Sequence, residues 1–232
     1  MNVQRALVAE FIGTAMLLLA IVGSGIMAER LCGNVGLELL VNALATGGAL
    51  VALILAFGPV SGAHFNPAVT IADAWQGGLA WSYVAPYIVA QVLGALFGTA
   101  LADVMFGLPP FFASHHQRGG AMMGTSEFVA TFGLLVVIWG CVRSRPAATP
   151  FAVAAYIVGA YWFTPSTSFA NPAVTIARSF TDTFAGIRPI DAPLFIAAQL
   201  LGGLAATALF AFLSPISKTA AQAVVLPHPE VA

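Results

Sequence analysis

Charged residues are scarce in this sequence. Only eight Lys or Arg and nine Asp or Glu occur among 232 residues, which is 7% of the chain, whereas 59% of the residues are hydrophobic. The mean hydropathy of +0.93 lies far outside the balance of a soluble globular domain. So little charge excludes a water-soluble fold and a basic surface for nucleic acid. The composition therefore indicates an integral membrane protein.

Cysteine and histidine are also rare. Cys32 follows the first apolar run and Cys141 lies near the end of the fourth, so no disulfide framework is indicated. His115 and His116 are adjacent but have no acidic or thiol residue near them in the sequence, which makes a poor metal site. The chain has no clustered nucleophile and base and no glycine-rich phosphate loop. We therefore expect no enzyme activity, no metal and no cofactor.

Long apolar runs, by contrast, are abundant. A helix needs about 20 apolar residues to cross about 30 Å of hydrocarbon, and six segments approach or reach that length. The fifth is short and bounded by prolines. The predicted spans are residues 6–28, 37–57, 83–106, 121–142, 150–164 and 193–213.

The seven-residue segment NPAVTIA occurs twice, at residues 66–72 and 171–177. Matching segments flank the two copies in the same order, which indicates an internal duplication. They are EF with a Thr at residues 10–14 and 127–131, and IVAQVLGAL at 88–96 against IAAQLLGGL at 196–204.

Each half of the duplication contains three predicted spans. Because three is odd, the second half enters the membrane facing the opposite way, as in many transport folds. We assign residues 1–116 to the first repeat and 117–217 to the second, which together form one membrane domain. The small, polar, Pro-containing segment 218–232 is expected to be a mobile tail.

Each NPAVTIA copy begins with a helix-starting pair. Asn supplies an N-cap, and Pro supplies a fixed φ at the first helical position. Residues 67–76 would form a helix of about 15 Å, half the hydrocarbon thickness. Two such half-helices, entering from opposite faces, would meet N-terminus to N-terminus. Asn-Pro more often marks a surface turn, but two copies in equivalent places disfavour that reading. Irregular backbone at membrane depth must be buried in protein or line a water-filled path, so segments 59–65 and 165–170 should line a pore.

These residues resemble the aquaporin and glycerol-facilitator family, whose mark is two NPA boxes on inverted half-helices. The resemblance covers nearly the whole chain and implies an all-α membrane protein with six transmembrane helices and two re-entrant half-helices. It also implies a homotetramer in the bacterial cytoplasmic membrane, with both termini in the cytoplasm. Each asparagine should then point an amide donor into the pore, and each helix N-terminus adds about half a positive charge. The implied pore residues are Asn66, Pro67, Ala68, Asn171, Pro172 and Ala173.

Three further positions take roles from the resemblance. Glu10 and Glu127 lie within spans, where an unpartnered carboxylate is costly, so they should face the protein interior. In the family such residues accept hydrogen bonds from the re-entrant loops. A proton relay in an ion-coupled transporter is the alternative. His64 should lie near the cytoplasmic mouth, in the pore vestibule.

The outer constriction departs from that of water-selective members, which use an aromatic residue, a histidine and an arginine. Transfer by spacing places it at Thr46, Gly159, Ser168 and Val174, none of which is aromatic, basic or large. Val174 stands where the arginine usually lies. Arg178, four residues later, lies on the same face of the half-helix, so its side chain either reaches back toward the gap or lies in the outer vestibule. We favour the vestibule, because a full helical turn adds about 5.4 Å. The sequence therefore predicts a wide gate of low polarity.

Such a gate suits solutes larger than water. The resemblance implies a passive channel for water, glycerol, other polyols, urea and neutral metalloid hydroxides such as arsenite, which excludes ions and protons. A water-selective channel and an ion-coupled carrier that uses Glu10 and Glu127 are the alternatives.

Overall fold

The computed structural model describes residues 2–214, and all regular structure within that range is helical. The predicted tail, 218–232, lies outside the described residues. In chain order the helices are α1 (Val3–Cys32), α2 (Val35–Ser61), α3 (Pro67–Gln76), α4 (Trp81–Met105), α5 (Ala121–Ser144), the 3-10 turn η1 (Pro146–Ala148), α6 (Thr149–Phe163), α7 (Pro172–Arg178) and α8 (Ala192–Leu213).

All six predicted spans coincide with a helix. Five of these helices, α1, α2, α4, α5 and α8, are long and apolar enough to cross a membrane. The sixth, α6, has 15 residues, which corresponds to about 22 Å at 1.5 Å per residue. A proline near its start and an extended residue, Thr164, at its end set that length. The fifth predicted span is short in the sequence because the helix that it forms is itself short.

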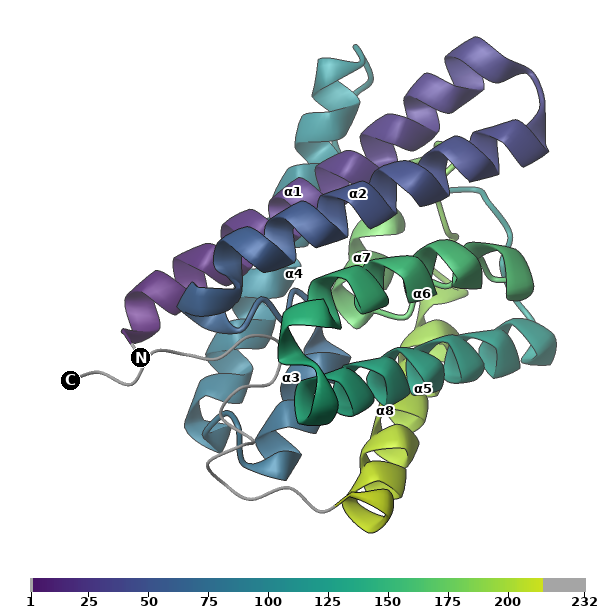
Figure 1. The fold of residues 1–232 in the computed structure, drawn as a ribbon. Coiled ribbons are helices and arrows are strands. Elements are labelled where there is room, and N and C mark those ends of the chain that lie inside the picture. The colour runs from purple at the N-terminus through teal and green to yellow at the C-terminus, as the bar shows by residue number, and fades with distance from the viewer. Residues whose placement is uncertain (1, 215–232) are drawn as a thin grey trace.

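The two halves of the chain are arranged alike. In the first half α1 packs against α2 and α4, and in the second half α5 packs against α6 and α8. Helices α2 and α6 pack together and join the halves, while α3 and α7 lie inside the bundle and meet there (Figure 1). This arrangement places both NPAVTIA copies at the centre of the molecule.

The two half-helices start alike but differ in length. α3 has ten residues, as predicted, whereas α7 has seven and ends at Arg178. The amides of Ser179 and Phe180 donate to the carbonyls of Ile176 and Ala177, three residues back, which tightens the last turn. The chain then folds back so that the Ile187 amide donates to the Arg178 carbonyl at 3.2 Å. The second half-helix is therefore shorter than the repeat suggests.

Glycines allow the closest helix crossings. A Cβ on Gly94 would lie 2.3 Å from the carbonyl oxygen of Phe11, and one on Gly98 would lie 2.1 Å from that of Ala15. A Cβ on Gly202 of α8 would likewise lie 2.4 Å from the carbonyl oxygen of Phe128 in α5. Backbone atoms fill the space that a side chain would need, so α4 can touch α1 only without side chains at these positions.

We expect Gly98→Val to destabilise the protein by about 3 kcal/mol or more, because overpacking against backbone cannot be relieved by a rotamer change. The measurement is the thermal unfolding of the detergent-solubilised protein. Gly48→Val is the control, since a Cβ there would meet no atom within 4 Å. Equal melting temperatures for the two variants would contradict close contact between α1 and α4.

Candidate functional site

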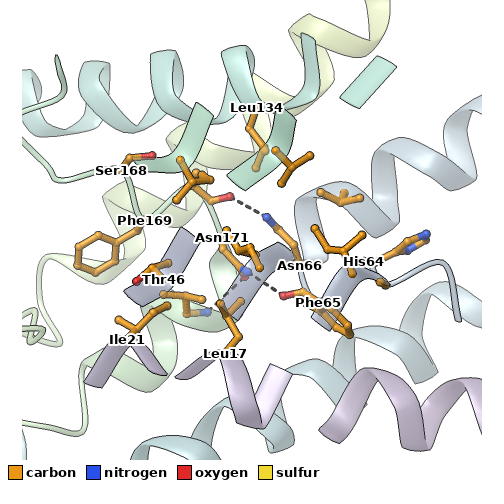
Figure 2. Close-up of a pocket in the computed structure, with 18 of the residues that line it drawn as sticks. Leu17, Ile21, Thr46, His64, Phe65, Asn66, Leu134, Ser168, Phe169 and Asn171 are labelled. Atoms are coloured by element: carbon orange, nitrogen blue, oxygen red, sulfur yellow. Dashed lines mark hydrogen bonds between the residues drawn. The ribbon is translucent and has the colours of Figure 1, made fainter. Parts of the chain in front are cut away.

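The side chains of Asn66 and Asn171 meet at the centre of the bundle. The amide nitrogen Nδ2 of Asn66 donates to the carbonyl oxygen of Ala170 at 2.8 Å, and that of Asn171 donates to the carbonyl oxygen of Phe65 at 2.7 Å (Figure 2). Each asparagine therefore ties its own half-helix to the loop of the other half. A primary amide carries two N–H donors, so one donor of each asparagine remains for a solute.

Each asparagine also caps its own helix. The Oδ1 atom of Asn66 accepts from the Ala68 amide at 2.9 Å, and that of Asn171 accepts from the Ala173 amide at 3.0 Å. Pro67 and Pro172 occupy the first helical positions, as the sequence predicts. The two Asn-Pro-Ala segments thus fix where α3 and α7 begin. The N-termini of these two half-helices face each other.

The loops that precede the asparagines carry unusual backbone conformations. Phe65 and Ala170 have φ of 48° and 49°, and Ala63, Thr167 and Ser168 also have positive φ. Residues other than glycine rarely adopt this region, so the surrounding structure must hold the loops in place.

Two buried carboxylates hold these loops. Glu10 accepts hydrogen bonds from the amides of His64 at 3.0 Å and Phe65 at 2.7 Å, and from the side chains of Ser61 and Gln91, both at 2.7 Å. These bonds satisfy the carboxylate and orient the loop at the same time.

Glu127 does the same in the second half. It accepts from the amides of Phe169 at 2.9 Å and Ala170 at 2.8 Å, and from Nε2 of Gln199 at 2.6 Å. The matching residues of the two repeats therefore make matching bonds. Both carboxylates bond to the loop backbone, as the resemblance implies, which leaves the proton-relay alternative without support in the structure.

A cavity of about 70 Å³ lies between the two loops and the surrounding helices, which is room for several water molecules. The asparagines and the irregular segments Ala63–Phe65 and Ser168–Ala170 form part of its wall. The rest of the two predicted segments, 59–62 and 165–167, does not line it, and Pro59 is exposed on α2. Most of the remaining wall is apolar, formed by Leu17, Ile21, Leu50, Ile54, Leu134, Ile138, Val153 and Ile157.

Three of the four predicted constriction residues, Thr46, Ser168 and Val174, line this cavity, but Gly159 does not. Residues of α6 that lie four apart share one side of the helix, and Val153, Ile157 and Tyr161 form the wall there. Gly159, which was selected by counting back from Asn171, therefore lies on another side of α6.

Tyr161 of α6, and not Gly159, contributes to the cavity wall. It is buried, lines the cavity and shares a hydrogen bond with Thr46, 3.1 Å between the hydroxyl oxygens. Phe169 is a second aromatic residue in the wall. The cavity wall therefore contains aromatic side chains that the transfer by spacing did not predict. The four-residue spacing along α6 was the signal that could have identified Tyr161.

Arg178 also lies elsewhere than predicted. Instead of extending into an open vestibule, its side chain is only 2% exposed and lines the cavity. The guanidinium carbon lies 3.4 Å from the ring centroid of Phe169, and Nε donates to the carbonyl oxygen of Ala185. The cavity wall thus contains an arginine despite Val174.

A second arginine, Arg118, approaches the same ring from the connection between α4 and α5. Its guanidinium carbon lies 5.2 Å from the Phe169 centroid, and its Nε donates to the carbonyl oxygen of Gly186 at 2.8 Å. Burial lowers the pKa of Arg118 from its ordinary value. No local sequence pattern points to this residue, since its place depends on how residues 179–191 fold.

His64 lies in the wall of the cavity, in the other half of the repeat. Its Nδ1 lies 3.2 Å from the Thr70 hydroxyl, and its Nε2 lies 3.6 Å from a carboxylate oxygen of Asp73. Both side chains of this pair are buried. Within residues 2–214 no group of three or more His, Cys, Asp or Glu could hold a metal ion.

Known proteins resemble this chain in sequence and in fold. The profile of the family described as major intrinsic protein matches residues 1–168. The aquaglyceroporin AqpS of Rhizobium meliloti is 51% identical over 212 residues, covering 91% of each chain. Aquaporin Z of Rhodopseudomonas palustris is 35% identical, covering 93% of this chain and 95% of the relative. The solved structure of the aquaglyceroporin from Plasmodium falciparum has the same fold, with a TM-score of 0.68, 20% identity, and coverage of 90% of this chain and 96% of that one.

Proposed function

Because this chain belongs to the major intrinsic protein family, we propose that it is a passive membrane channel for water and small uncharged solutes such as glycerol. The observation that carries the proposal is the pair of asparagines that face an apolar cavity from two opposed half-helices. The walls accept the carbon skeleton of a polyol, and the amides replace some of its hydrogen bonds to water.

The same wall excludes ions. Removing an ion from water into an apolar setting costs tens of kcal/mol, which two amide donors cannot offset. The N-termini of α3 and α7 add partial positive charge next to the asparagines and oppose the entry of cations and protons. A neutral hydroxyl-bearing solute meets neither barrier.

The two alternatives are less well supported. A water-selective channel has no use for an apolar wall of this extent, which suits contact with a carbon skeleton. An ion-coupled carrier requires carboxylates that can exchange protons, whereas Glu10 and Glu127 are held by loop amides and glutamine side chains.

Stopped-flow light scattering of proteoliposomes tests the proposal. We expect faster swelling than in protein-free vesicles under inward gradients of both glycerol and arsenite. The rates should be unchanged by an imposed pH gradient or an uncoupler. Swelling in glycerol and arsenite at the protein-free rate would favour a water-selective channel, and a response to the pH gradient would favour a carrier.

We further propose the location and assembly that the family resemblance implies. The protein would be a homotetramer in the bacterial cytoplasmic membrane, with one pore per subunit and both termini in the cytoplasm. The bacterial origin of the two relatives named above supports the location. The large exposed apolar side chains on the outer faces of the helices, such as Phe97, Phe151 and Leu201, suit contact with lipid or with neighbouring subunits.

A further inference from the structure

The two repeats contain the same hydrogen-bond network around their asparagines. In the first repeat, Nε2 of Gln91 donates to Glu10 at 2.7 Å and to the Thr70 hydroxyl at 2.8 Å. The Thr70 hydroxyl in turn donates to the carbonyl oxygen of Asn66 at 3.0 Å. The second repeat has the same three bonds, at 2.6, 2.8 and 2.9 Å, between Glu127, Gln199, Thr175 and Asn171. Both half-helices therefore have the same support for their first turn.

A histidine and an aspartate distinguish the first repeat from the second. His64 stands two residues before the asparagine of its repeat, and Asp73 seven residues after it. The second repeat has Phe169 and Arg178 at these places. In Figure 2, His64 and Phe169 lie at opposite ends of the cavity wall, with the two asparagines between them. Since the second loop is held without a histidine, the contact between His64 and Asp73 serves another purpose than support of the loop.

The hydrogen bonds around His64 fix the place of one ring proton. Because the Thr70 hydroxyl gives its only proton to Asn66, it accepts from Nδ1 of His64, 3.2 Å away. Nδ1 therefore carries a proton. Nε2 lies 3.6 Å from a carboxylate oxygen of Asp73, and two unprotonated atoms would repel each other at that distance. A second proton, shared between Nε2 and the carboxylate, removes this repulsion.

Few other ionisable groups lie near this pair. Glu10 of α1 accepts from the His64 amide at 3.0 Å, and the ring centroid of Tyr87 in α4 lies 5.5 Å from that of His64. Arg143 of α5 donates to the side chain at the end of α3. Arg178 of α7 lies at the opposite end of the cavity, against the phenylalanine of that loop. Helix α8 and the half of α2 that leads into the loop have no ionisable residue.

Loss of the shared proton would leave two buried carboxylates, those of Glu10 and Asp73, beside one loop. Glu10 has four hydrogen-bond donors, whereas Oδ1 of Asp73 has no hydrogen-bond partner among residues 2–214. A buried carboxylate with so few donors is unfavourable. The one N–H group that a neutral imidazole keeps is therefore drawn to Asp73, because hydrogen bonds to an ionised acceptor are the stronger ones.

This shift changes the contacts of Asn66. With its remaining proton on Nε2, the His64 ring has an acceptor at Nδ1, which then accepts a hydrogen bond from the Thr70 hydroxyl. A hydroxyl has one proton, so Thr70 gives up its bond to the Asn66 carbonyl. The first turn of α3 thereby loses one of the contacts that hold Asn66 in the cavity wall.

We propose that Asp73 makes His64 a proton-dependent switch of this channel. At neutral pH the pair shares a proton and Thr70 holds Asn66, so solutes pass. As the pH rises, the proton leaves by way of the cavity that His64 lines, Thr70 releases Asn66, and the permeability falls for water and glycerol alike. This inference rests on the proposed function, since it concerns the regulation of the same passage.

The test is the stopped-flow permeability of proteoliposomes to water and to glycerol, with equal pH on both sides, from about pH 6 to about pH 9. We expect both permeabilities of wild type to fall about fivefold, the population shift that corresponds to the loss of one hydrogen bond. Asp73→Asn should vary less than about twofold, because its histidine has no carboxylate with which to share a proton. The double variant that combines Asp73→Asn with His64→Phe, the residue of the second repeat, should be equally insensitive to pH.

The matched control is His115→Asn. His115 and Asp182 form a second pair of this kind, 2.9 Å apart, but the His115 side chain is exposed and does not line the cavity. Its pH profile should equal that of wild type. A second readout is the nitrogen-15 spectrum of histidine-labelled protein in detergent, in a variant whose other three histidines are replaced by asparagine. We expect His64 to lose one of two ring protons over the same range of pH.

A wild type whose permeability does not change with pH would overturn the inference, and so would the same fall in Asp73→Asn as in wild type. If neither Asp73 variant folds, the nitrogen-15 titration decides, and an unchanged number of ring protons on His64 would overturn the inference. Failure of wild type to pass water or glycerol at any pH would instead defeat the proposed function, and the titration would still test the pair.

Discussion

Val174→Arg is expected to reduce glycerol permeability at least tenfold and water permeability by a smaller factor. Val174 is 2% exposed, lines the cavity and lies one helical turn before Arg178 on α7. A guanidinium at this place would occupy much of a cavity of about 70 Å³ whose wall already contains the Arg178 cation. A solute of several heavy atoms loses more from this narrowing than a single water molecule does.

Stopped-flow measurements on the same proteoliposome preparations check this expectation. Val174→Ile is the control, because it adds one methylene group and no charge, and its glycerol permeability should stay within about twofold of wild type. Unchanged glycerol permeability in Val174→Arg would show that solutes do not pass this position.

Glu127→Ala is expected to destabilise the protein by about 3–5 kcal/mol, because three buried donors lose their acceptor at once. The substitution leaves the amides of Phe169 and Ala170 and the Gln199 side chain without their acceptor. Each buried donor left unpaired costs about 1–3 kcal/mol. Ala170 would then lose the contact that holds its left-handed conformation.

The readout is the melting temperature of the solubilised protein, with glycerol flux as a second measurement. Glu10→Ala should have an effect of similar size, since Glu10 makes the equivalent bonds in the first repeat. Glu29→Ala is the control, because Glu29 is exposed and accepts one hydrogen bond, from the Phe184 amide. If Glu127→Ala melted like Glu29→Ala, the carboxylate would not be what holds the loop.

The architecture could be predicted because its signals are local or repeated. An Asn-Pro pair starts a helix by capping and by a fixed φ, whatever surrounds it, and both half-helices begin where that pair predicts. Apolar runs set the spans, because hydrocarbon excludes unpaired backbone and charge. A carboxylate inside a span needs a partner, and Glu10 and Glu127 both have theirs in the loops.

The cavity wall was harder to predict. Three of the positions that transfer by spacing selected, Thr46, Ser168 and Val174, line the cavity. The transfer failed for Gly159, since the irregular segment 164–170 separates α6 from Asn171 and the phase of α6 decides which side chain faces inward. Residue counting does not carry helical phase through an irregular loop.

The amino-acid sequence was enough to predict a duplication of three spans, two half-helices that begin at asparagines, and a carboxylate in each half that faces the protein interior. Which side chains share the cavity wall with those asparagines followed from the fold and not from the sequence pattern. Arg178, Arg118 and Phe169 come together because the segment after α7 folds back and presents the carbonyls of Ala185 and Gly186 to the two arginines. Capping and hydrophobic burial act over a few residues and can be predicted from sequence. Arg178 lies nine residues from Phe169, across the start of α7, whereas Arg118 reaches the same ring from 51 residues away, which only the tertiary structure brings about.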